Sequence, residues 1–200
     1  MDEPDDAARG GRADARRNRE RLLAAAKAAF AELGAGANLE EIARRAGVGI
    51  ATLYRNFPSR EAILEAVYRR DVEDHSASAT RLLETMAPGD ALHEWMRRAL
   101  NYAATKRGMS AALASITDGS SELYAYSSRL YLDAVTQLVR RATESGDIRE
   151  GVDPMDLLGA LGGLTHGIGR ADWQPRALRL LDILMDGLRY KPPTRRQSQE

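Results

Sequence analysis

Residues 38–57 carry the pattern of two short helices joined by a glycine turn. The first helix has one apolar face at helical spacing, formed by Leu39, Ile42, Ala43 and Ala46. Asn38 stands before this face as a favourable N-cap residue, with Glu41 in the first turn. Gly47 follows the face, where a left-handed backbone favours glycine. Two short helices with such a turn form the unit that places a recognition helix in the major groove of DNA.

The second helix has equally clear limits. It opens at Gly49, and Leu53 lies on its buried face. Pro58 ends it, because proline has no N–H group and disfavours helical geometry in the residue before it. Ser59 then caps a third helix, which is predicted over residues 60–80.

The outer surface of the second helix distinguishes a DNA-binding unit from an ordinary helical hairpin, which would share the same apolar pattern. Its side chains and the first residue of the next helix are hydrogen-bond donors, and none is acidic: Thr52, Tyr54, Arg55, Asn56 and Arg60. Phosphate contacts come from such side chains. Residues 9–60 hold 11 Arg and Lys against 5 Asp and Glu, whereas residues 61–200 hold 18 against 20. A local basic excess is typical of a nucleic-acid-binding surface.

The run LEEIARRAGVGIATLYRNFPSREAILEAV resembles the N-terminal DNA-binding domain of the TetR family of bacterial repressors. Its features are an IA-x-x-AGV turn, a T-L-Y-x-x-F recognition helix and a P-S-[KR]-E-x-[IL]-L segment. The resemblance includes the preceding helix, with Ala25, Ala26, Phe30 and Leu33. The C-terminal two-thirds of the chain carries no comparable motif.

The resemblance implies a homodimer that places two recognition helices on a quasi-palindromic double-stranded DNA operator. Three side chains match positions that usually hold phosphates: Thr52, Tyr54 and Arg60. Five residues match positions that face the bases: Gly49, Ile50, Ala51, Arg55 and Asn56. The resemblance also implies a small-molecule inducer that releases the DNA, with repression as the commoner outcome.

Composition excludes several other classes of protein. The 200 residues are 44% hydrophobic and 6% aromatic and include no cysteine, which favours packed helices and excludes disulfides and thiolate metal sites. The chain has no signal-peptide pattern and no apolar run long enough to span a membrane. The three histidines are far apart, and H-E-x-x-H and G-x-S-x-G do not occur. We expect a soluble cytoplasmic protein with no enzymatic activity, metal, cofactor or membrane partner.

The expected fold class is all-α, with an N-terminal three-helix helix-turn-helix domain and a C-terminal helical bundle, about nine helices in all. Residues 1–15 lack apolar periodicity and are predicted to be a disordered arm. Residues 16–60 are the predicted DNA-binding domain, linked by the 60–80 helix to a ligand-binding and dimerisation domain over residues 61–190. A disordered tail is predicted for residues 191–200. The bundle helices are predicted over residues 88–107, 110–116, 122–145, 154–169 and 175–190.

The arm and the start of the first helix are rich in arginine: Arg9, Arg12, Arg16 and Arg17. Arms of this type can contact the minor groove or the phosphates, as homeodomain arms do. A solubilising tail is the alternative interpretation, and the sequence leaves both open.

The predicted 154–169 helix has no charged residue between Leu157 and Gly169. Three glycines repeat every four residues along it: Gly159, Gly163 and Gly167. Each interior glycine costs about 1 kcal/mol relative to alanine, so this face suggests a closely approached backbone. A helix buried within one chain is one interpretation, and we favour a subunit interface that forms a four-helix bundle with the next helix. The predicted interface residues are Gly159, Gly163, Gly167, Leu178, Leu181 and Met185.

Candidate ligand contacts are the larger apolar and aromatic residues of the bundle: Trp95, Met96, Tyr102, Met109, Leu113, Tyr124, Tyr131 and His166. Each of them could equally be part of an ordinary core. This mixture with few buried charges favours an apolar or aromatic ligand. Two alternatives stay open: control of the same fold by a protein partner or by no ligand, and a ligand-sequestering or interaction module with an idle DNA-binding domain.

Overall fold

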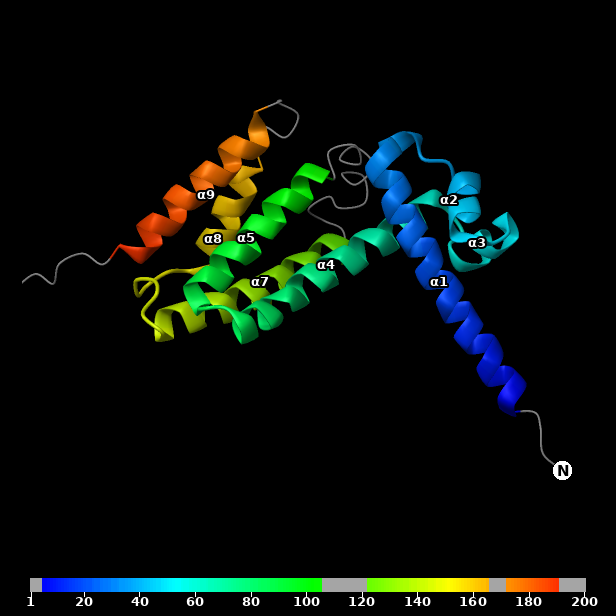
Figure 1. The fold of residues 1–200 in the computed structure, drawn as a ribbon, viewed down its shortest axis with the longest axis horizontal. Coiled ribbons are helices and arrows are strands. Elements are labelled where there is room, and N and C mark those ends of the chain that lie inside the picture. The colour runs from blue at the N-terminus through cyan, green and yellow to red at the C-terminus, as the bar shows by residue number, and fades with distance from the viewer. Residues whose placement is uncertain (1–4, 106–121, 166–171, 191–200) are drawn as a thin grey trace, which may run out of the picture. The chain divides into compact units, whose positions relative to one another are not determined.

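The computed structural model describes residues 5–105, 122–165 and 172–190, and all regular elements in these ranges are helical (Figure 1). Within these ranges there are eight α-helices and one short 3-10 helix, so the predicted all-α class is confirmed. The elements are α1 (Asp5–Leu33), η1 (Gly34–Gly36), α2 (Leu39–Ala46), α3 (Ile50–Asn56), α4 (Arg60–Thr85), α5 (Pro88–Thr105), α7 (Glu122–Glu144), α8 (Pro154–Leu164) and α9 (Trp173–Arg189). The predicted 110–116 helix lies outside the described residues, as do Met109, Leu113, His166 and Gly167.

The chain divides into two compact units, which we call the head (residues 1–71 and 105–126) and the body (residues 72–104 and 127–200). The sequence placed this boundary after residue 60. The first part of α4 belongs to the head instead, because Ile63, Leu64 and Val67 pack in the head core. The single helix α4 therefore contributes residues to both units.

Four helices contribute buried side chains to the head core. The fully or almost fully buried members include Leu22, Ala26 and Phe30 of α1, Ile42 and Ala43 of α2, Leu53 of α3, and Ile63 of α4. Alanine at position 43 lets α2 lie close to its neighbours, and each large apolar side chain contributes roughly 1.5–3 kcal/mol when buried. An ion pair of 2.6 Å between Lys27 Nζ and the buried Asp71 carboxylate also joins α1 to α4.

The first helix begins earlier than the sequence indicated. We expected a disordered arm over residues 1–15 and a helix from Arg16, but α1 begins at Asp5. Alanine and arginine are strong helix formers, and acidic residues at positions 5 and 6 suit the positive end of the helix dipole. Those preferences outweigh the two glycines at positions 10 and 11 and the lack of apolar periodicity, on which the prediction of a disordered arm rested.

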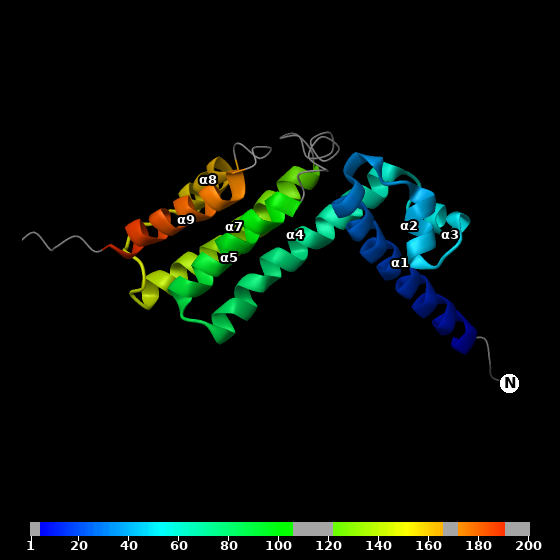
Figure 2. The ribbon, with the colours of Figure 1, turned by 45° about the horizontal axis from the view of Figure 1, so that its top comes forward.

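The body core is built around Trp95 of α5, Leu138 of α7 and Leu181 of α9, all with no exposed surface. Figures 1 and 2 show α5 and α7 side by side, with α8 and α9 forming a neighbouring pair. The two tryptophan indoles donate to main-chain carbonyls: Trp95 Nε1 to His75 O at 3.1 Å and Trp173 Nε1 to Leu164 O at 2.8 Å.

Two helix limits in the body differ from those predicted. Helix α8 ends at Leu164 rather than near Gly169, where the Thr165 hydroxyl donates to the Gly162 carbonyl at 2.7 Å. This local bond competes with continuation of a helix already weakened by glycine. Helix α9 begins at Trp173, two residues before Pro175. Proline is tolerated in this first turn, because the N–H groups there have no partner within the helix.

Candidate nucleic-acid interface

The turn between α2 and α3 is set by local hydrogen bonds. The Asn38 side chain accepts from the Glu40 N–H at 2.7 Å and so caps α2. Gly47 has a left-handed backbone (φ 64°, ψ 38°), and its N–H donates to the Arg44 carbonyl at 3.0 Å. The Val48 N–H donates to the Ala43 carbonyl at 3.0 Å, which completes the closing pattern of a Schellman motif. The predicted cap and turn are therefore confirmed.

Helix α3 is held in place from one side only. Leu53 is fully buried in the head core, and the Leu53 N–H donates to the Gly49 carbonyl at 3.2 Å. The helix ends at Asn56, and Phe57 adopts an extended backbone before Pro58. The buried Phe57 ring then anchors the C-terminal end of α3.

The opposite side of α3 faces solvent. Gly49, Ala51 and Arg55 are exposed, Ile50 retains 37% of its accessible surface, and Tyr54 retains 47%. A Cβ added to Gly49 would meet nothing within 4 Å, so no part of the described chain covers this end. The surface made by Gly49, Ile50, Ala51, Tyr54 and Arg55 is acid-free, and we call it the α3 outer face.

Thr52 organises the two side chains that the sequence assigned to base contacts. The Arg55 guanidinium donates to the Thr52 hydroxyl at 2.8 Å, and the Asn56 amide donates to the Thr52 carbonyl at 2.8 Å. Both side chains are thus directed along α3 before any duplex is present. Arg55 keeps further donors that this bond does not use, since a guanidinium carries five N–H groups.

Arg60 is placed differently from the other predicted contacts. Its guanidinium donates to the Ala37 carbonyl and lies over the Phe30 ring, 5.4 Å from the ring centroid. These contacts connect the start of α4 to the segment before α2. They favour a structural role for Arg60 over the predicted phosphate contact.

Two arginines of α1 that the sequence did not single out contact the helix-turn-helix. Arg19 Nη1 donates to the Asn56 carbonyl at 3.3 Å, and its guanidinium lies 4.4 Å from the centroid of the Phe57 ring. Arg21 Nη2 donates to the Gly47 carbonyl at 3.4 Å. The two residues therefore touch the C-terminal end of α3 and the turn before it. No local pattern marks them, because their partners are far away in sequence.

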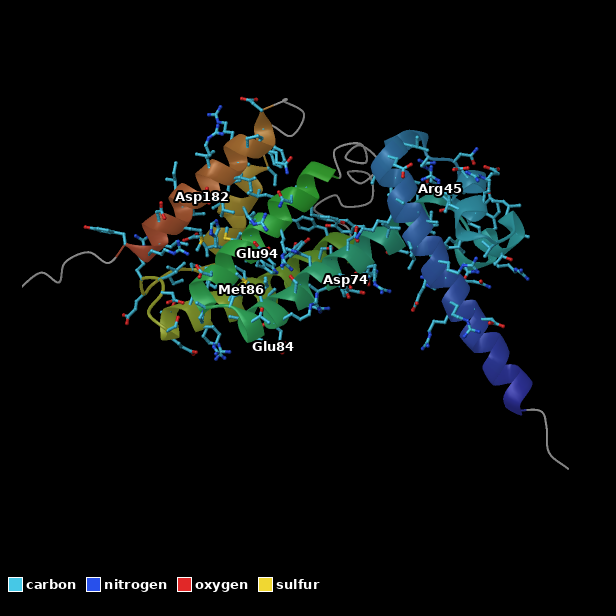
Figure 3. The ribbon with its side chains drawn as sticks, viewed as in Figure 1. Arg45, Asp74, Glu84, Met86, Glu94 and Asp182 are labelled. Carbon is cyan, nitrogen blue, oxygen red and sulfur yellow. The ribbon has the colours of Figure 1, made fainter. Side chains whose placement is uncertain are left out.

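The arginines of α2 are locally neutralised. Arg44 and Arg45 both bond the Glu41 carboxylate at 2.7 Å, and Arg45 also bonds Glu32 at 2.8 Å (Arg45 is labelled in Figure 3). The hydrogen bond from Arg44, followed by that from Arg45, lowers the pKa of Glu41 to about 2. Arg44 and Arg45 therefore keep little positive charge that is available to an anion.

The predicted subunit interface needs one correction. Leu181 and Met185 are fully buried in the core of a single chain, so they are not available to a partner. The outward side of α9 carries Leu180 and Ile183, which are 42% and 66% exposed. Successive helical positions differ by about 100° in direction, which separates these two sides of α9.

Helix α8 leaves its glycine face open. A Cβ added to Gly159, Gly162 or Gly163 would meet no described atom within 4 Å. Leu157 is buried, whereas Met155 on the first turn is 55% exposed. The open glycine face argues against the interpretation of α8 as a helix covered on all sides within one chain.

The predicted ligand residues have different surroundings. Trp95 and Met96 are buried in the body core, Tyr102 and Tyr131 are half-buried, and Tyr124 is exposed and belongs to the head. An open groove of about 510 Å³ on the body is lined by none of them and lies between α7 and residues 150–154.

Sequence reasoning missed His75. Its ring stacks on Trp95 with centroids 4.5 Å apart and meets the edge of Tyr131 at 5.6 Å. Burial, followed by the charge of Arg98, lowers the pKa of His75 to about 4, so the ring is neutral at pH 7. Among the described residues, nothing bonds its Nε2 atom.

Two other kinds of site receive no support from the described part of the chain. A lipid bilayer could not be crossed by any of its helices, since none combines the necessary length and hydropathy. Within the same ranges, no three His, Asp or Glu side chains are grouped to hold a metal ion.

Comparison with known proteins agrees with this geometry. Residues 22–67 match the model of bacterial regulatory proteins of the tetR family, and residues 87–190 match the C-terminal domain model of SbtR-like transcriptional regulators. No curated protein gives a significant match.

Solved structures extend the similarity over almost the whole chain. A TetR transcriptional regulator from Streptomyces coelicolor is 42% identical, with a TM-score of 0.75, 87% of this chain covered and 99% of that one. A TetR transcription regulatory protein from Mycobacterium vanbaalenii is 33% identical, with a TM-score of 0.72 and coverage of 90% and 99%. The fatty acid degradation regulator FadR from Bacillus halodurans shares the fold at 18% identity, with a TM-score of 0.60 and coverage of 87% and 97%.

Proposed function

Because this chain belongs to the TetR family of bacterial transcription regulators, we propose that it represses genes as a homodimer and releases its operator on binding a small molecule. The observation that carries the DNA-binding part is the α3 outer face. It is exposed, free of acidic residues and fixed from behind by Leu53 and Phe57. We infer a cytoplasmic location from the proposed binding to a bacterial operator.

The residues of α3 divide into two proposed roles. Thr52 and Tyr54 bind phosphates, which contribute affinity and register but no sequence information. Arg55 reads guanine and Asn56 reads adenine, while Ile50 and Ala51 meet thymine methyl groups. Arg55→Ala should cost about 1–3 kcal/mol and relax specificity at one operator position, whereas Tyr54→Phe should weaken binding to all sequences alike.

The proposed dimer uses the open sides of α8 and α9. Glycines permit close approach of two backbones at α8, and Leu180 and Ile183 supply exposed apolar surface on α9. Pairing with a second copy about a two-fold axis would cover both surfaces in one four-helix bundle. A two-fold axis would also present two recognition helices to half-sites about 34–36 Å apart.

The inducer is proposed to bind in the body. Support comes from the half-buried aromatic residues Tyr102 and Tyr131 and from His75, whose neutral ring favours an uncharged ligand. Such a ligand can release DNA only to the extent that it binds the DNA-incompetent conformation more tightly.

Binding-site selection from random duplex DNA tests the proposal, followed by the salt dependence of binding to the enriched site. We expect a quasi-palindrome with half-sites about one duplex turn apart and a steep salt slope. Small molecules would then be screened for release of that duplex. No enriched sequence, together with a flat salt response, would overturn the DNA-binding role of the head.

A further inference from the structure

Residues 14–21 of α1 place no buried side chain in the head core. Residues 5–21 include no apolar side chain larger than alanine, and Leu22 is the first buried side chain among those described. Figures 1 and 2 both show this part of α1 extending beyond α2 and α3. The two glycines at positions 10 and 11 weaken the helix further. A core function therefore does not explain this segment.

Its arginines continue the face of α1 that packs into the head. At seven-residue steps two series run along the helix: Arg9, Arg16, Leu23 and Phe30, and Arg12, Arg19 and Ala26. Helical positions seven apart differ by only about 20° in direction. Ala26 and Phe30 are buried in the head core, and Leu23 packs against it. The side of α1 that is apolar within the head thus carries arginine beyond it.

Arg19 shows where this series meets the recognition helix. Its guanidinium contacts the Asn56 carbonyl at 3.3 Å and lies over the Phe57 ring, at the C-terminal end of α3. Arg16 is exposed one turn further along. Asp14, by contrast, is paired with Arg17, which lies on another side of the helix. The arginine series therefore meets the recognition helix at the C-terminal end of α3.

We propose that Arg9, Arg12, Arg16 and Arg19 form a second DNA-contact surface, which binds the phosphate backbone beside the groove entered by α3. The inference rests on the proposed function, since it requires that α3 binds duplex DNA. A guanidinium can bond phosphate oxygens in a bidentate manner, which suits it to this task. Residues 9–19 cover about 15 Å of helix, comparable to four base pairs of duplex. Phosphates are alike in every sequence, so this surface adds affinity without changing the preferred operator.

The test is the salt dependence of operator binding, measured by fluorescence anisotropy with the full-length protein and the duplex enriched by site selection. The triple variant Arg9→Ala/Arg12→Ala/Arg16→Ala removes three members of the surface and leaves Arg19, which touches the head. Each lost phosphate contact should lower the slope of log Kobs against log salt by about 0.9, and by about 5 for all three in both protomers of a dimer. Affinity should fall by at least about tenfold, with the selected sequence unchanged.

Two further variants serve as controls. Arg17→Ala removes an arginine from the same helix but another side, and it should leave the slope unaltered. Arg9→Lys/Arg12→Lys/Arg16→Lys keeps the charge and should keep most of the slope. An unchanged slope for the triple alanine variant, with operator binding intact, would overturn the second surface and leave the proposed function standing. A changed sequence preference would overturn the backbone assignment, whereas absence of any operator for the wild-type protein would overturn the proposed function itself.

Discussion

The head and the body are both helical, but the surface that α3 leaves open in the head differs in character from the surface that α8 and α9 leave open in the body. In the head, Leu53 and Phe57 seat α3 firmly, and most of what α3 exposes is small or polar. In the body, α8 and α9 expose Met155, Leu180 and Ile183 beside an open glycine face. A surface that binds DNA can stay hydrated in the free protein, because its partner is polar. A surface that binds another apolar face costs free energy in the free protein, because its apolar side chains are exposed to water.

Buried polar groups show the same contrast. In the described part of the body, His75 Nε2 and Ser76 Oγ are buried without a hydrogen-bond partner. His93 Nε2 is a different case, since it lies 2.9 Å from the Asp182 carboxylate. An unsatisfied buried group costs about 1–3 kcal/mol. Among the described residues, the buried side-chain atoms without a hydrogen-bond partner thus lie in the body, where a second molecule could satisfy them.

The largest expected effect lies in the head. Leu53→Ala removes the buried anchor of α3 and should lower the free energy of unfolding by about 2–5 kcal/mol. The same variant should lose operator binding. Urea unfolding followed by circular dichroism measures the first effect, and anisotropy with the operator measures the second. Ile50→Ala, on the exposed side of the same helix, should change stability by less than about 0.5 kcal/mol. Equal stability of the two variants would contradict the one-sided anchoring of α3.

Acid should weaken the body before the head. The folded pKa of His75 is about 4, below the ordinary value of 6.5, so the unfolded chain takes up the proton first. The contribution of the neutral His75 ring to the free energy of unfolding is fully present above pH 6.5. It is lost as the pH falls towards 4, by at most about 3 kcal/mol. The ionised Glu41 carboxylate in the head has a pKa of about 2, so the stability that it contributes is fully present above pH 4.5 and is lost as the pH falls from 4.5 towards 2.

Urea unfolding at pH 7 and pH 4.5 measures this difference. His75→Phe keeps a ring that can stack on Trp95 but cannot take up a proton, so its stability should fall less between the two pH values than that of the wild-type protein. A parallel loss in both proteins would exclude His75 as the cause.

Ile183→Arg tests the open side of α9. The residue is 66% exposed, so arginine fits the single chain, but at a two-fold interface it would meet its own copy. We expect dimerisation at least about 100-fold weaker, which corresponds to about 2.7 kcal/mol, with unchanged helical content. Analytical ultracentrifugation measures the dimer, and Leu181→Arg is the contrast, since that residue is buried and its variant should unfold the body. Undiminished dimerisation of Ile183→Arg would place the interface elsewhere.

The smallest effects should have opposite signs at two glycines. Gly47→Ala puts a side chain on a left-handed backbone at φ 64°, which should cost about 1–2 kcal/mol. Gly163→Ala adds a methyl group that meets nothing in the described part of its own chain, so it should stabilise the protomer by up to about 1 kcal/mol. Urea unfolding in an Ile183→Arg background separates this gain from any loss of dimer. A destabilised Gly163→Ala protomer would show that the glycine face is covered within the chain.

Features that nearby residues determine could be predicted from the sequence, whereas features that depend on packing between helices could not. Asn38, Gly47, Pro58 and Ser59 act on residues within a few positions of themselves, so the limits of α2 and α3 and the start of α4 could be predicted. The sides of α9 could not be assigned in this way. Ile183 and Met185 are both apolar, and only the packing of other helices decides which of them is buried.

Contacts with α1 were missed for a related reason. Arg19 meets Phe57 across 38 positions of sequence, and no local spacing marks the pair. The start of α1 was missed because residues 1–15 lack apolar periodicity, while the helical preference of their alanines and arginines was given too little weight.

The length of α3 has a consequence for its dynamics. Helices of fewer than about 12–15 residues are marginal in isolation, and α3 spans only Ile50–Asn56. It therefore exists only while Leu53 and Phe57 are seated, and its amide hydrogens exchange with solvent when the head core opens. Operator DNA at a concentration of about 100 times Kd would raise the free energy of that opening by about 2.7 kcal/mol. The protection gained would extend to α1, α2 and the start of α4, so the recognition helix and the core behind it open and close as one cooperative unit.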